Sequence, residues 1–192
     1  MLRRLYDWTL SLAETRYALW ALAAVAFVES SVFPIPPDIL MIPMIIAAPR
    51  KAWLIAGVCT VFSVLGGAFG YYIGAFLFDS IGLPVLEFYG KEKYFDEFAT
   101  RYNEWGAWAV LIAGITPFPY KVITILSGST GLNFAVFMIA SLFARGLRFF
   151  IVAGLLWKFG PPIKDFIEKR LGLMFTIFCV LLVGGFAAVR YL

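Results

Sequence analysis

Five ionisable side chains lie within or beside long apolar stretches of this sequence. They are Glu29, Asp38, Lys121, Arg145 and Arg148. A charged group at the centre of a membrane-spanning helix costs roughly 2.5–3.5 kcal/mol on insertion scales, so such groups pair with one another or line a pathway. Two acids and three bases leave one positive charge in excess when all five are ionised. That excess fits the binding of an anion, and the planar fork of arginine fits a phosphate group in particular.

The acids and the bases predict different roles. We expect Glu29 and Asp38 to exchange protons, because burial disfavours the charged form of a carboxyl group. We expect Lys121, Arg145 and Arg148 to bind the headgroup of an anionic substrate, with the two arginines, three positions apart, on one helix face. One alternative is that all five form a structural salt-bridge network. Another is that Glu29 or Arg148 alone extends to the membrane surface.

Proline-rich turns interrupt two of the apolar stretches. The prolines of these turns are Pro34, Pro36 and Pro37 in the first stretch and Pro117 and Pro119 in the second. Proline lacks a backbone N–H and blocks helix continuation, so each stretch is split into arms shorter than the roughly 20 residues that cross a bilayer. We therefore expect two re-entrant helical hairpins, over residues 17–48 and 108–131.

The two proline turns repeat with an offset of 83 positions, which carries Asp38 to Lys121. An apolar run suitable for a membrane span follows each hairpin, at 52–78 and at 132–157. This pattern predicts an inverted-topology repeat of one hairpin and one spanning helix, an arrangement typical of transporters. Equivalent positions at the two hairpin tips would bring Asp38 and Lys121 together as an ion pair.

The composition is that of a membrane protein. The chain of 192 residues is 62% hydrophobic and 15% charged, whereas soluble domains average about 45–50% and about 25%. Residues 171–189 are uncharged and predict a further spanning helix. Residues 1–16 and 84–105 predict amphipathic helices on the membrane surface. The expected fold is an all-α polytopic membrane protein with a single domain.

Glycines recur every four residues in the first predicted span, at Gly66, Gly70 and Gly74. A stripe of small residues lets another helix approach closely, so we expect it to be a packing face. A groove for a lipid tail is the alternative.

Basic residues gather in three segments, at the N-terminus, at 49–51 and at 158–170. They are Arg3, Arg4, Arg16, Arg50, Lys51, Lys158, Lys164, Lys169 and Arg170. The positive-inside rule places these segments in the cytoplasm, with the N-terminus inside and the C-terminus outside. A bacterial inner membrane is the expected location.

The sequence gives no support for metal or nucleophilic chemistry. It contains no histidine, which is the commonest metal ligand. Cys59 and Cys179 lie far apart in apolar runs, without a metal or redox spacing. We expect no metal, no cofactor, no enzymatic activity and no nucleic-acid partner.

Several of these motifs together resemble the DedA family, of the VTT domain type, and most closely its short YqaA-like branch. They are Glu29, the Pro34-x-Pro36-x-Asp38 turn, the glycine-rich span ending Gly70-Tyr71-Tyr72-Ile73-Gly74, and the second proline hairpin with the basic span after it. The resemblance covers about residues 17–158. It implies paired re-entrant hairpins and the movement of lipids between leaflets, including the recycling of polyprenyl-phosphate carriers in bacteria and phospholipid scrambling in eukaryotic relatives.

The family's membrane acids match Glu29 and Asp38, but its second-hairpin arginines do not match. Gly114 stands in place of one arginine, and Tyr120-Lys121 in place of the other. We predict a flippase or scramblase that moves an anionic phospholipid or a polyprenyl phosphate, with proton coupling as an option. A small-ion or solute transporter is the alternative. The expected partners are membrane lipids, and a homo-oligomer is compatible with the sequence.

Overall fold

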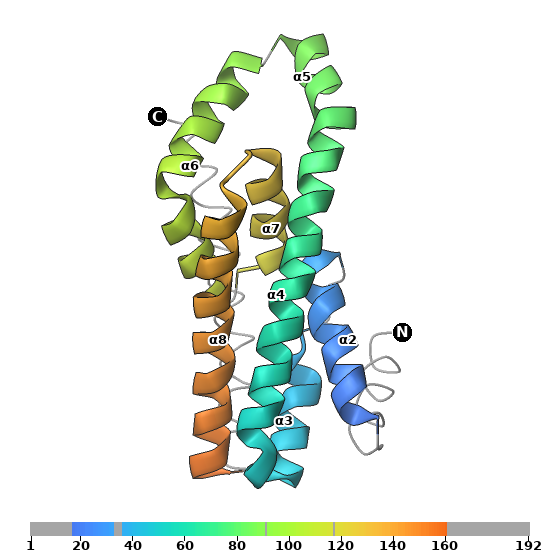
Figure 1. The fold of residues 1–192 in the computed structure, drawn as a ribbon, viewed down its shortest axis with the longest axis vertical. Helices are drawn as coiled ribbons and strands as arrows, with labels where there is room; N and C mark the ends of the chain where they lie inside the picture. The colour runs from blue at the N-terminus through green and yellow to red at the C-terminus, as the bar shows by residue number, and fades with distance from the viewer. Residues whose placement is uncertain (1–16, 33–35, 91, 117, 161–192) are drawn as a thin grey trace, which may run out of the picture.

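Every regular element in the described part of the chain is a helix. The computed structural model describes residues 17–32, 36–90, 92–116 and 118–160. The α-helices are α2 (Ala18–Ser31), α3 (Asp38–Ala47), α4 (Ala52–Leu77), α5 (Leu83–Tyr89), α6 (Glu92–Ile115), α7 (Tyr120–Ser129) and α8 (Phe134–Phe159) (Figure 1). The predicted surface helix at 1–16 and the predicted span at 171–189 lie outside the described residues.

Two long helices form the centre of the molecule. Helices α4 and α8 each contain 26 residues and match the predicted spans at 52–78 and 132–157. Helix α4 continues through a π-helical turn (Phe78–Gly82) into α5, so that helical structure runs without a break from Pro49 to Tyr89. This segment and α8 are both long and apolar enough to cross a membrane.

The chain reverses direction at both proline turns. Helix α3 runs opposite to α2, and α7 runs opposite to α6, with both reversals near the middle of the molecule (Figure 1). Pro37 and Pro119 immediately precede α3 and α7. Proline is tolerated at a helix start, because the backbone N–H that it lacks would have no partner inside the helix. Pro34 and Pro117 lie outside the described residues.

The structure contains two helices where the sequence predicts a single helix over 84–105. Helix α5 ends at Tyr89, and Gly90 follows in the left-handed conformation with a φ of 60°. Glycine adopts that conformation without strain and commonly ends a helix. Helix α6 then begins at Glu92 and continues to Ile115, so it includes the first arm of the second hairpin.

The helices repeat with an offset one residue shorter than that of the proline motifs. Helices α3 and α7 have 10 residues each and begin 82 positions apart, at Asp38 and Tyr120. The 26-residue helices α4 and α8 also begin 82 positions apart. Counted from the helix starts, Tyr120 is the position that matches Asp38, and Lys121 is one position further along its helix.

Two apolar clusters fill the interior on either side of the charged residues. One cluster joins α2 and α3 to α4 and to the second half of α8, and includes Leu22, Met41 and Phe149. The other joins α6 and α7 to the first half of α8, and includes Val110 and Phe137. Each hairpin thus has its own apolar contact with α8, and Arg145 lies between the two contacts along that helix.

The glycine stripe of α4 is a packing face, as predicted. A methyl group on Gly66 would overlap the backbone carbonyl of Phe27 in α2, and one on Gly74 would overlap the carbonyl of Ile125 in α7. The two hairpins therefore cover this face at backbone contact, which removes the alternative of an open groove there. Only glycine permits such a close approach.

Gly74→Ala is expected to destabilise the protein by about 1–3 kcal/mol, because a buried methyl group must push α7 away from α4. Gly57→Ala is the matched control in the same helix, where an added methyl group meets no atom within 4 Å. Alanine there is expected to be neutral or to stabilise by up to about 1 kcal/mol. Thermal unfolding of the purified variants measures both changes. Equal unfolding temperatures for the two variants would contradict the packing argument.

Candidate functional site

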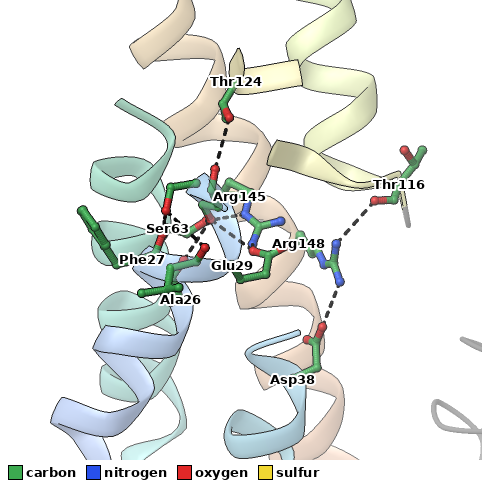
Figure 2. A network of polar contacts seen from close by, with 12 residues as sticks. Ala26, Phe27, Glu29, Asp38, Ser63, Thr116, Thr124, Arg145 and Arg148 are labelled. Atoms are coloured by element: carbon green, nitrogen blue, oxygen red, sulfur yellow. Dashed lines mark hydrogen bonds and ion pairs between the residues drawn. The ribbon is translucent and has the colours of Figure 1, made fainter. Parts of the chain in front are cut away.

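Four of the five predicted ionisable residues form two ion pairs at the level of the hairpin tips. Arg145 Nη2 lies 2.9 Å from Glu29 Oε2, and Arg148 Nη2 lies 2.9 Å from Asp38 Oδ2 (Figure 2). Each pair joins α8 to an arm of the first hairpin. The two arginines are one helical turn apart, so a single face of α8 presents both guanidinium groups.

The first pair belongs to a buried hydrogen-bond network. Arg145 Nε donates to Ser63 Oγ of α4 at 2.6 Å. The Ser63 hydroxyl is 2.7 Å from that of Ser30, which also donates to Glu29 Oε2 at 3.2 Å. A closed ring of polar contacts thus joins α2, α4 and α8, and its members are Arg145, Ser63, Ser30 and Glu29. Figure 2 labels Arg145, Ser63 and Glu29 of this ring.

Aromatic rings enclose the Arg145 guanidinium. Its central carbon lies 4.8 Å from the ring centre of Tyr120 in α7 and 4.6 Å from that of Phe149. Desolvated cation–π contacts of this kind contribute about 2 kcal/mol. Only 1% of the Arg145 side chain is exposed, against 17% of Glu29. Arg145 is therefore held on all sides within the protein interior.

The second pair is more open and has fewer contacts. The Arg148 side chain is 16% exposed and that of Asp38 is 7% exposed. Arg148 Nη1 makes a long hydrogen bond of 3.4 Å to the backbone carbonyl of Thr116, in the turn of the second hairpin. Arg148 thus contacts both hairpins, through Asp38 on one and Thr116 on the other (Figure 2).

The predicted ion pair between Asp38 and Lys121 is absent, because Asp38 pairs with Arg148 instead. The side chain of Lys121 is half-buried, and no ion pair involves it within the described part of the chain. The physical reason is the packing of α8 against the first hairpin, which brings the Arg148 guanidinium within 2.9 Å of Asp38. Tyr120, the residue before Lys121, is fully buried and packs against Arg145.

Sequence reasoning missed the polar residues that connect the network. Ser30, Ser63 and Tyr120 are buried, and so is Thr124, whose hydroxyl donates to the backbone carbonyl of Ser30 at 3.2 Å. This bond links the two hairpins directly (Figure 2). A search for isolated hydroxyl residues inside the apolar runs would have found all four, although not their partners.

The paired charges compensate one another. Each carboxylate lies 2.9 Å from its arginine, and both arginines extend from the same face of α8. Two acids and two arginines give no net charge, and Lys121, which is half-buried, belongs to neither pair. In such an arrangement an arginine can bind an anion in place of its carboxylate partner, and a carboxylate can accept and release a proton.

The described fold has two helices long and apolar enough to cross a membrane, with buried ion pairs between one of them and the first hairpin. A family model for the VTT domain matches residues 35–158. The chain therefore belongs to the VTT domain family, that of the DedA proteins, which are generally membrane-associated transporters.

The relatives are bacterial and archaeal. The chain is 34% identical over 168 residues to an uncharacterized protein of Haemophilus influenzae, covering 85% of this chain and 87% of that protein. It is 36% identical, with the same coverage, to an uncharacterized protein of Histophilus somni. A more distant similarity, 28% identity over 69% of this chain and 79% of the relative, is to an uncharacterized protein of Methanocaldococcus jannaschii. No solved structure matches the chain significantly.

Proposed function

We propose that this protein moves an anionic lipid, either a phospholipid or a polyprenyl phosphate, between the leaflets of the bacterial inner membrane as a flippase or scramblase. The observation that carries the proposal is the position of Arg148, a partly exposed arginine held between two hairpin tips by one carboxylate and one carbonyl. A guanidinium in that position binds a phosphate group well. Membership of a family of membrane transporters supports the same reading.

The proposal includes an inverted repeat made of α2–α4 and α6–α8, with re-entrant hairpins. Three observations support it: the offset of 82 positions and the equal lengths that relate α3 to α7 and α4 to α8, and the opposite directions of corresponding helices (Figure 1). A fourth is that Ser63 and Arg145 are equivalent at this offset and are hydrogen-bonded to each other. Residues beside a two-fold axis contact their own equivalents, so such an axis would pass between α4 and α8. Rocking of the two repeats would then open the site to each leaflet in turn.

Within this mechanism the five charged residues have three roles. Arg148 and Lys121 bind the headgroup, because they retain exposure and have few or no competing contacts. Arg145, which the sequence assigned to the headgroup, instead anchors the hairpins to α8 through Glu29 and Ser63. Asp38 carries the proton, and Glu29 is a second carrier only when its network opens. In the proposed orientation the N-terminus faces the cytoplasm, as the positive-inside rule predicts.

Reconstitution into liposomes tests the proposed activity. The purified protein is expected to move labelled phosphatidylglycerol or labelled polyprenyl phosphate between leaflets, at a rate above that of protein-free liposomes. A gradient of pH should change the rate when transport is proton-coupled. Failure to move either lipid with and without the gradient would exclude the proposal. Uptake of a water-soluble anion without lipid movement would favour the alternative of a small-ion or solute transporter.

A further inference from the structure

The two arginines of α8 differ in how easily each can exchange its partner. Arg145 has an ion pair, a 2.6 Å hydrogen bond and two ring contacts. Its remaining nitrogen, Nη1, has no partner but is fully enclosed, so a ligand cannot reach it. Arg148 has one ion pair and one long hydrogen bond, and part of its side chain is exposed. An incoming anion can therefore compete for Arg148 but not for Arg145.

We infer that Asp38 occupies the place that the phosphate group of the substrate takes on Arg148, so that the substrate and Asp38 exclude each other there. This inference rests on the proposed function. Asp38 contacts Arg148 through one oxygen and one nitrogen, at 2.9 Å, rather than through both arms of the guanidinium fork. A phosphate can use both arms, and bidentate pairing with arginine is stronger and more specific.

When a phosphate group displaces Asp38 from Arg148, the Asp38 carboxylate is left without a cation. The other ionisable side chains of this region are Arg145 and Glu29, which pair with each other, Tyr120, whose ring packs on Arg145, and the buried thiol of Cys59. Lys121 forms no ion pair within the described residues. Asp38 is only 7% exposed, and a buried ionised carboxylate without a partner is costly enough to become neutral.

The consequence is a coupled exchange. Binding of one phosphate anion breaks the contact between Arg148 and Asp38, and one proton from water binds the free carboxylate. Release of the anion returns Arg148 to Asp38 and the proton to water. No covalent bond of the substrate changes. Each anion bound therefore brings one proton, and the site is occupied either by Asp38 or by the substrate.

A proton-uptake measurement on the wild-type protein tests this inference. The probe is dihexanoyl phosphatidylglycerol, a phosphodiester with no titration of its own near neutral pH. We expect close to one proton taken up per molecule bound, measured with a pH indicator in weak buffer or by calorimetry in two buffers. The affinity should fall with rising pH, by up to about tenfold per unit. Binding without proton uptake would overturn the inference and leave the proposed function standing. Absence of binding would count against both.

Two variants sharpen the result. Asp38→Asn removes the competitor and the proton acceptor together, so we expect tighter binding, no proton uptake and no dependence on pH. If Asp38 instead contacts the substrate directly, the same variant will bind more weakly. The control is Asp79→Asn, which alters an exposed acid in the turn between α4 and α5. It is expected to keep both the affinity and the proton uptake of the wild type.

Discussion

Arg145→Met will destabilise the protein by about 3–5 kcal/mol, because removal of one partner of a buried ion pair leaves the other charge uncompensated. Glu29 loses its cation, and Ser63 loses its hydrogen-bond donor. The ring contacts with Tyr120 and Phe149 lose their charge as well. The measurement is thermal unfolding of the purified protein, together with the amount that accumulates in the membrane.

Two further variants show whether the loss comes from the unpaired charge. Arg148→Met removes the more exposed arginine of the same helix face. We expect a smaller loss, of about 1–2 kcal/mol, because this pair is nearer to solvent and Asp38 can become neutral by taking up a proton when its cation is removed. The double variant Glu29→Leu with Arg145→Met should recover much of the stability, because an apolar pair replaces a buried ion pair at little cost. Equal losses of stability for Arg145→Met and Arg148→Met would contradict the distinction between the enclosed pair of Arg145 with Glu29 and the more exposed pair of Arg148 with Asp38.

Arg148→Gln will reduce lipid movement at least about tenfold while the protein remains folded, because a hydrogen bond to a charged group contributes about 1.5–3 kcal/mol. Glutamine keeps some hydrogen-bonding capacity but removes the charge that attracts the phosphate. The measurement is the rate of lipid movement in liposomes, with the unfolding temperature of the same preparation. Lys121→Gln should reduce the rate by a smaller factor, since its side chain is only half-buried and contributes no ion pair in the described structure.

Arg101→Gln provides the control, because Arg101 is an exposed arginine of α6 outside the site. It should leave the rate unchanged. A purely structural network makes a different prediction. Asp38→Ala and Arg148→Ala would then both lower the amount of protein in the membrane, and the charge exchange Asp38→Arg with Arg148→Asp would restore it. Restored accumulation together with full lipid movement would contradict a substrate role for Arg148.

Several features could be predicted from the sequence because they depend on local residue types. Apolar runs of sufficient length predict α4 and α8, and Gly66 and Gly74 predict a face of close helix contact. The prolines predict where helices cannot continue, and α3 and α7 indeed begin after Pro37 and Pro119. The high cost of a charge in an apolar environment likewise predicts that Glu29, Asp38 and the arginines meet one another. None of these inferences requires knowledge of which segments are neighbours.

The tertiary structure alone decided which charges pair. The proline motifs repeat at 83 positions and the helices at 82. One residue rotates a side chain by about 100° around a helix axis. In the structure the ring of Tyr120 packs against Arg145, Lys121 forms no ion pair among the described residues, and Asp38 pairs with Arg148. The sequence determined that charges would be buried in a membrane protein with two broken helices. Only the packing of α8 between the hairpins decided that Arg145 is enclosed while Arg148 stays partly exposed.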